Sequence, residues 1–331
     1  MTSLKLGSVQ CEAGGKATGF VTAVNRVDGT DLGIPVIIVH GKKDGPVLLV
    51  DGGIHGDEQE GTFAISEFAR ELDPEKLRGT FVGVPVLNTA SFEAMERGNP
   101  RDHHSYDMNR IYPGRPNGYL TERIAHIHDT EIAAVADLEM AIHSGGNICY
   151  LGETIFFPTG DQASFELARS MGQDWEIILD APRSGGSPMA AMAERGKPAI
   201  TVELGGCATT MPGDLRHNID VLKRSFANTC RHYGMIEGQA EYAASVWRGK
   251  QQVVQASKSG LLEPNPEIPI KKPIREGELL LRITDFFLEP IEELRAPCDG
   301  TLFGFRTYPS VFAGDWSLFC AEATYESMES L

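Results

Sequence analysis

Short apolar runs alternate with turn-rich stretches over the first part of the chain. Runs at 19–24, 34–40 and 46–53 predict strands that are separated by Gly, Asp and Lys turns. Residues 61–72 carry apolar side chains at helical spacing, and residues 80–87 predict a buried strand. A strand, a helix and a second strand in this order indicate a parallel sheet with helices on its faces.

The same reading continues to about residue 240. Apolar spacing predicts helices at 119–136, 165–172, 187–196 and 215–233, and strands at 138–143 and 198–206. Between them, residues 93–118 contain no convincing element and are rich in Asn, Pro, Gly, Arg and His. A loop of that length in a compact domain is usually functional or disordered, and its aromatic content favours order.

The pattern changes near residues 240–245, where we place a boundary between domains 1–242 and 243–331. The second part has short apolar runs and many Pro and Gly turns, which predict a small β-domain. Its runs REGELLLRI, RAPCDGTL and VFAGDWSLF resemble a lipoyl-type barrel-sandwich domain. Asp285, Phe286 and Phe287 stand where the carrier lysine of such a domain would be, so the resemblance implies the shape and not a swinging-arm carrier.

Composition and charge narrow the range of functions. The chain has 331 residues and a formal net charge of −16, which argues against nucleic acid or an anionic membrane as a partner. No stretch approaches the ~20 apolar residues that span a membrane, and the amino terminus lacks a signal-peptide pattern. We therefore expect a cytoplasmic protein. Homo-oligomer formation is possible, and the sequence does not decide it.

The six cysteines are scattered along the chain and form no CxxC pair. Neither a zinc ribbon nor a thioredoxin-type motif is therefore indicated, and free thiols are the simpler interpretation.

Candidate chemistry begins in the stretch VDGGIHGDEQEG at 50–61. His55 and Glu58 lie three residues apart just after a predicted strand, where open α/β sheets place ligand sites. Imidazole with carboxylate is a zinc-type donor pair, and a catalytic zinc takes three protein ligands. The alternative is a solvated loop whose acid caps the following helix.

Two later strands end in the same way. His143 closes the strand at 138–143 and is followed by glycines, and Glu203 stands near the end of the strand at 198–206. A histidine in this position is more often structural, and the acid could be a salt-bridge partner. A carboxylate that a buried strand delivers to a cleft is, however, well placed for a general base.

The long loop adds three polar candidates, Arg101, Asn109 and Arg110. Arginine binds planar carboxylates with two parallel hydrogen bonds. An acidic protein would concentrate such positive charge where an anionic substrate docks. The alternative for each arginine is an ordinary surface position.

These motifs together resemble the succinylglutamate desuccinylase/aspartoacylase family, which is related to the zinc carboxypeptidases. The resemblance covers six motifs in family order: HGDE at 55–58, NPR at 99–101, DMNRIYPG at 107–114, TERIAH at 121–126, HSGG at 143–146 and ELGG at 203–206. It implies an α/β fold with a mixed, mainly parallel sheet flanked by helices and a small carboxyl-terminal β-domain.

The resemblance also implies residue roles. It gives His55, Glu58 and His143 as the ligands of one Zn²⁺ per chain, and Glu203 as the base that moves protons. Asn109 and Arg110 correspond to the clamp for the substrate's α-carboxylate. Arg101 corresponds to the residue that polarises the scissile carbonyl, although its spacing from the DMNR stretch is short.

One position departs from the family pattern. The family usually has an acid two residues before the third ligand, and this chain has Ala141. Metal-bound histidines normally donate to a nearby acceptor. We expect either that Asp51, Asp57 or a backbone carbonyl orients the histidines, or that zinc affinity is reduced.

The expected activity is zinc-dependent hydrolysis of the amide bond of an N-acyl amino acid. The alternatives are a zinc carboxypeptidase acting on small peptides and a metal-free binding protein of the same fold. No GxSxG motif supports a serine hydrolase. Cys207 follows the ELGG turn, but an inert buried cysteine is commoner than a nucleophilic one.

Overall fold

A long mixed sheet runs through the molecule in this computed structural model, which describes residues 3–104, 106–206 and 212–328. Its first strands are β3 (Gly15–Asn25), β4 (Asp31–His40), β5 (Lys43–Asp51) and β6 (Arg78–Val84). Its central strands are β7 (Leu138–His143), β8 (Cys149–Pro158), β9 (Ile177–Ala181) and β10 (Ala199–Gly206). Its last strands are β11 (Ser245–Gln255), β13 (Pro273–Ile274), β16 (Gly300–Arg306) and β18 (Trp316–Ser327).

The order of the twelve strands is β13-β16-β18-β11-β9-β8-β10-β7-β5-β6-β4-β3. Parallel pairing is confined to β6-β5-β7-β10 and to β8-β9-β11, and the other neighbours are antiparallel. The mixed sheet was expected, but the expectation that it is mainly parallel holds only for these two blocks. The chain adds the β3–β4 and β16–β18 strands as antiparallel neighbours at the two sides.

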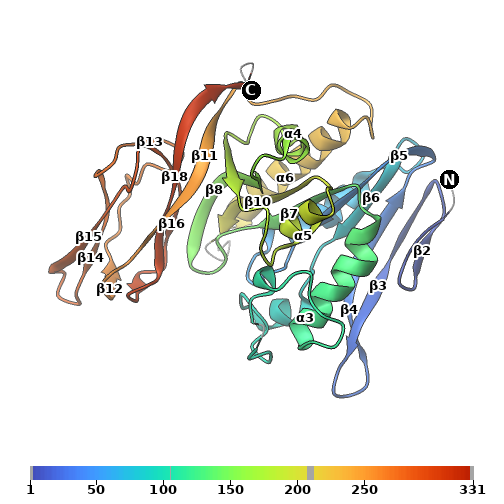
Figure 1. Cartoon of the computed structure of the whole chain (residues 1–331), viewed down its shortest axis with the longest axis horizontal. Coiled ribbons are helices and arrows are strands. Elements are labelled where there is room, and N and C mark those ends of the chain that lie inside the picture. Colours follow the sequence, from blue (N-terminus) through green and yellow to red (C-terminus); the bar gives the residue numbers. More distant parts are fainter. Residues whose placement is uncertain (1–2, 105, 207–211, 329–331) are drawn as a thin grey trace.

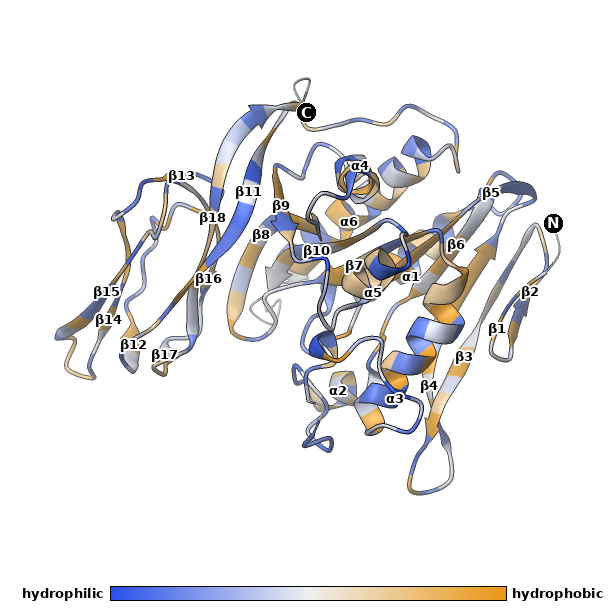
Figure 2. Cartoon of the chain, viewed as in Figure 1, coloured by the Kyte–Doolittle hydropathy of each residue, from blue (hydrophilic) through white to orange (hydrophobic). Residues whose placement is uncertain are grey.

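Six α-helices lie among the described residues: α1 (Glu60–Glu71), α2 (Thr89–Ala94), α3 (Leu120–Ile127), α4 (Gln162–Ser170), α5 (Pro188–Glu194) and α6 (Pro212–His232). Alternate residues of a strand point to opposite faces of the sheet. Accordingly Leu48 and Val50 of β5 pack in a core with α1, α4 and α6. Leu49 packs in a second core with α3 and α5. Helices thus cover both faces of the central strands, where hydrophobic residues concentrate (Figures 1 and 2).

The region after residue 242 continues the central sheet. Strand β11 pairs with β9 in parallel, and β16 pairs with β8. Four further strands form a separate sheet with the order β15-β14-β12-β17: β12 (Gly260–Leu262), β14 (Leu279–Thr284), β15 (Pro290–Arg295) and β17 (Ser310–Val311). This part has its own core, yet the shared sheet fixes it beside the central strands (Figure 1).

Local differences from the predicted elements are few. The predicted helix at 119–136 is divided into α3, a π-helical turn at His128–Ile132 and a 3₁₀ turn at Ala133–Val135. The loop at 93–118 includes the end of α2 and a 3₁₀ turn at Met108–Arg110. The sequence analysis missed β8 and β9, and the small amino-terminal hairpin of β1 (Leu4–Leu6) and β2 (Val9–Cys11).

In the part of the chain that the structure describes, every helix is too short or too polar to cross a membrane.

Candidate metal centre and its cavity

The predicted ligands meet at the carboxyl ends of neighbouring parallel strands. Strand β7 lies between β5 and β10, and its last residue, His143, is in register with Glu203 of β10. Neighbouring strands lie ~4.8 Å apart, so the backbone alone places these two residues side by side. His55 and Glu58 follow the end of β5 at the same edge of the sheet.

Three donor groups converge there. The Nδ1 atom of His55 lies 2.7 Å from Glu58 Oε1, and the Nδ1 atom of His143 lies 2.9 Å from Glu58 Oε2. The two Nδ1 atoms are 3.3 Å apart. All three side chains are buried. The fold therefore brings together the three residues that the motifs pointed to, and their role as metal ligands stays a prediction.

The turn that carries His55 and Glu58 needs its glycines. A Cβ atom at Gly56 would come within 2.1 Å of the backbone of Ser91, so no larger residue fits there. Gly53 has a φ of +62°, a region that glycine adopts without strain. These two positions let the backbone bend back from β5 so that both ligand-type side chains face His143.

Electrostatics favour an ionised carboxylate in this cluster. Burial by itself would raise the pKa of Glu58, but the adjacent His55 and His143 outweigh it and lower that pKa. Burial lowers the pKa of His143, and Glu58 offsets only part of this effect. Two imidazole nitrogens and a carboxylate within contact distance of one another are a donor set that zinc accepts. The residues present therefore fit one Zn²⁺, as the sequence analysis expected.

Asp107 supplies an acceptor for His55. His55 donates from Nε2 to Asp107 Oδ1 over 3.1 Å, which leaves Nδ1 facing Glu58. The acids that the sequence analysis named have other roles: Asp57 accepts a hydrogen bond from the backbone N–H of Asn147, and Asp51 belongs to a separate buried cluster. Asp107 was visible in the DMNR motif, but only the fold shows that it reaches His55.

Glu203 stands next to the three donor groups without joining them. Its side chain is partly buried, and its Oε2 atom has no hydrogen-bond partner among the described residues. Burial raises the pKa of Glu203 well above its usual range, and the negative charge of Glu58 adds to this effect. A carboxyl group in this setting can hold a proton, which is what a general base must do during turnover.

A cavity of about 790 Å³ opens over this edge of the sheet. The predicted residues His55, Glu58, Asn109, Arg110 and Glu203 all line it. Arg110 is exposed and donates from Nη1 to the backbone carbonyl of Asn109 over 2.8 Å. The cavity therefore brings together groups for a metal, a base and a carboxylate. The opposite wall comes from the carboxyl-terminal region, including Gln251, Phe303, Arg306, Asp315, Trp316 and Phe319.

Arg101 is not at this cavity, and another arginine is. The Arg101 side chain is exposed and does not line the cavity. Arg97 does line it, with Nη1 3.6 Å from Glu58 Oε1 and Nε 3.1 Å from Asp107 Oδ2. The sequence analysis missed Arg97 because it assigned the carbonyl-polarising role to the arginine of the NPR motif at 99–101. Arg97 lies before that motif.

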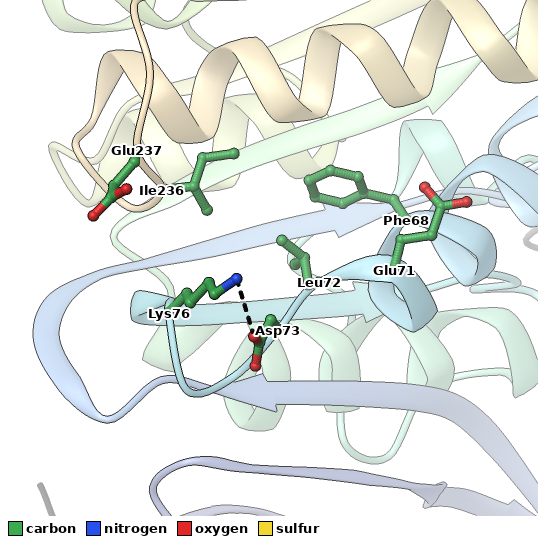
Figure 3. Close-up of a pocket in the computed structure, with 7 residues that line it drawn as sticks. All are labelled: Phe68, Glu71, Leu72, Asp73, Lys76, Ile236 and Glu237. Atoms are coloured by element: carbon green, nitrogen blue, oxygen red, sulfur yellow. Dashed lines mark ion pairs between the residues drawn. The ribbon is translucent and has the colours of Figure 1, made fainter.

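A smaller hollow of about 290 Å³ lies between α1 and the turn after α6 (Figure 3). Its lining includes Phe68 and Leu72, with an ion pair of 3.8 Å between Lys76 and Asp73. None of its lining residues is a histidine, so it offers no comparable donor set. Cys207, the other nucleophile considered from the sequence, lies outside the described residues.

The fold and the cavity thus define an α/β protein with a His–Glu–His group at a strand edge that could hold a metal ion. The family model for the succinylglutamate desuccinylase/aspartoacylase catalytic domain matches residues 44–230, more than half of the chain. The chain belongs to this family.

Similar proteins extend the match over nearly the whole chain. The N-alpha-acetyl-L-2,4-diaminobutyric acid deacetylase of Halomonas elongata is 29% identical over 330 residues, which cover 95% of this chain and 94% of that protein. Among solved structures, a succinylglutamate desuccinylase from a Silicibacter species has a TM-score of 0.84 at 24% identity, covering 97% of this chain and 100% of its own. The product-bound ectoine utilization protein EutE (DoeB) of Ruegeria pomeroyi has a TM-score of 0.83 at 25% identity, covering 96% and 99%.

Proposed function

We propose that this protein is a zinc-dependent hydrolase that removes the acyl group from an N-acyl amino acid. The observation that carries the proposal is the convergence of His55, Glu58 and His143 beside Glu203, with His55, Glu58 and Glu203 lining the cavity. The deacetylase activity in the name of the Halomonas elongata relative supports the same reaction class.

His55, Glu58 and His143 would hold the metal. When bound, zinc polarises the amide carbonyl and lowers the pKa of a water molecule toward ~7. Glu203 takes a proton from the attacking water on its unpartnered Oε2 atom and delivers it to the nitrogen of the departing amine. Asp107 holds the imidazole of His55 in the required orientation through Nε2.

The arginines divide the remaining tasks. Arg97 lies against Glu58 and Asp107, so we assign to it the stabilisation of negative charge on the reacting carbonyl oxygen, in place of Arg101. Asn109 and the exposed Arg110 bind the α-carboxylate of the substrate, because a guanidinium and an amide together match its two oxygens.

For the substrate, we propose an N-acetylated diamino acid as the first candidate. The name of the Halomonas elongata relative specifies such a compound, and its match covers the cavity walls in both halves of the chain. Residues of the carboxyl-terminal region close one side of the cavity, which favours a small substrate over a peptide. Rates on N-acyl amino acids compared with dipeptides would separate the deacylase from a carboxypeptidase.

Glu203→Gln tests the mechanism directly. The amide keeps the size of the side chain but cannot take a proton, so we expect kcat to fall by about 10³-fold while zinc remains bound. Glu96→Gln is the matched control, because Glu96 lines the same cavity and contacts Tyr106 instead of the metal centre. Bound zinc with full activity in Glu203→Gln would refute the role of Glu203, and a protein that binds no zinc would refute the metal dependence.

A further inference from the structure

A second group of ligand-type side chains is buried apart from the residues that line the cavity. Asp51 of β5, Glu139 of β7 and His128 of the π-helical turn bring one ligand atom each within 4.8 Å of one another. Their exposed fractions are 1%, 0% and 0%. Three elements from separate parts of the chain therefore meet at one position that solvent does not reach.

The two acids of this group contact each other. Asp51 and Glu139 share a side-chain hydrogen bond, and no hydrogen bond from another described residue reaches their carboxylate oxygens or Nε2 of His128. Buried polar atoms are normally paired, and leaving charged oxygens unpaired in a protein interior is costly. Two buried acids in contact need a positive charge between them, either a proton or a metal ion.

His128 is held as a ligand would be. Its Nδ1 atom is 3.0 Å from the hydroxyl of the buried Tyr112, and its Nε2 atom is 4.0 Å from Glu139 Oε1. With the proton on Nδ1 donated to Tyr112, the Nε2 lone pair faces the carboxylates. Metal-bound histidines typically have their second nitrogen fixed by such a hydrogen bond. The π-helical turn begins at His128, and turns of this kind are frequent at functional sites.

The sheet geometry explains why the two acids can approach each other. Asp51 is in register with Ala141, and Glu139 lies two residues before Ala141 on the same face of β7. Ala141 therefore stands beside Asp51 and next to Glu139 on one face of the sheet. The position that departs from the family pattern thus borders this group.

Among the described residues, no lysine or arginine side chain forms an ion pair with Asp51 or Glu139. Burial raises the pKa of Asp51, and burial together with the Asp51 carboxylate raises the pKa of Glu139. Burial lowers the pKa of His128 to about 3, so the imidazole is neutral. The nearby Arg195 is already paired with Asp129.

We propose that Asp51, His128 and Glu139 form a second divalent-cation site of the zinc type. Two carboxylates and one imidazole are donors that Zn²⁺ accepts. The site is distinct from the centre at His143, because Glu139 and His143 are four residues apart on one strand, or ~13 Å. Its role is structural: the ion joins the π-helical turn to β5 and β7.

Metal analysis on the full-length protein tests this site independently of the proposed reaction. After loading with Zn²⁺ and removal of free ion, we expect about two ions per chain in the wild type and about one in His143→Ala. The double variant His143→Ala/Glu139→Gln should bind none. Glu131→Gln in the His143→Ala background is the matched control, since Glu131 is an exposed acid of the same π-helical turn, and it should keep the ion.

The outcomes separate the two proposals. A folded His143→Ala protein without zinc would overturn the second site. It would mean that protons, and not a metal ion, neutralise Asp51 and Glu139. One ion in both the wild type and His143→Ala would support the second site and remove the proposed catalytic zinc. If Glu139→Gln fails to fold, thermal melting of His143→Ala with and without EDTA decides: a Tm lowered by the chelator supports the site, and an unchanged Tm overturns it.

Discussion

Arg97 and Arg101 stand four residues apart in the chain, yet only Arg97 faces the metal centre. We expect Arg97→Ala to lower kcat by about 10²-fold, since it removes the guanidinium assigned to the carbonyl oxygen. Arg101→Ala is the matched control and should change kcat less than twofold, because its side chain is exposed. Steady-state kinetics on an N-acetyl amino acid measure both. The reverse ranking would return the role to Arg101.

Asp107 permits a second test at the same scale. Asp107→Asn keeps the shape of the side chain but weakens the acceptor for His55 Nε2, so we expect zinc affinity to fall by about 10- to 100-fold. Competition with a chromogenic chelator measures that affinity. Tyr106→Phe, which removes a neighbouring hydroxyl that contacts Glu96, should leave it unchanged. Equal affinities in wild type and Asp107→Asn would show that Asp107 does not orient the ligand.

The sequence identified ligand-type residues better than their supporting partners. His55, Glu58 and His143 each stand at or just after the end of a strand, and the fold brings these three predicted residues together; their role as zinc ligands stays a prediction. Asp107 and Arg97 are common residue types in a loop without regular structure, and their value depends on which side chain they contact. Such contacts are long-range in the chain, and local patterns do not encode them.

At the scale of elements, an ion-pair network joins α1 to α6. Arg216 contacts Glu67 with two nitrogens, at 2.9 and 3.0 Å, and Lys223 lies 3.1 Å from the same carboxylate. Hydrogen bonding to Arg216 is the main cause that lowers the pKa of Glu67 to about 2. Because the folded pKa is depressed, the stabilisation is present above the ordinary value of 4.5 and is lost as pH falls toward 2.

Glu67→Gln should therefore lower the free energy of unfolding by about 0.5–1 kcal/mol at pH 7. Urea unfolding at pH 7, 5 and 3.5 measures the difference between the two proteins, which should shrink at the lowest pH. Glu166→Gln is the control, since the ion pair of Glu166 is with Arg169 of the same helix. A difference that is constant with pH would show that the Glu67 charge is not responsible.

The prediction of helices succeeded at 60–71, where apolar residues form most of the buried face. It failed in part at 119–136, where polar residues are buried as well. The helix at 60–71 has one apolar face, and its predicted bounds differ by a single residue. The segment at 119–136 has helical periodicity throughout, but His128 and Asp129 turn their polar side chains inward and the helix changes to a π turn there. Polar side chains are buried where distant parts of the chain supply partners for them. The spacing of apolar residues does not reveal those partners.

The whole molecule combines two parts of the chain around one cavity. The region after residue 242 was expected as a small separate β-domain, and the boundary itself stays a prediction. Its strands nevertheless join the central sheet through β11 and β16, and this pairing brings Arg306 and Trp316 to the cavity wall. Composition revealed the change of structure near residue 240, but strand pairing across that point depends on the complete fold.

This wall should limit the length of the substrate. Trp316 lines the cavity while 46% of it remains exposed, so Trp316→Ala would widen the entrance without leaving a large hole in the core. We expect kcat/KM for an N-acetyl dipeptide to rise about fivefold relative to that for an N-acetyl amino acid. Phe312→Ala is the matched control, because Phe312 is exposed in the adjacent turn and does not line the cavity. An unchanged ratio in Trp316→Ala, or an equal rise in both variants, would show that this wall does not select for small substrates.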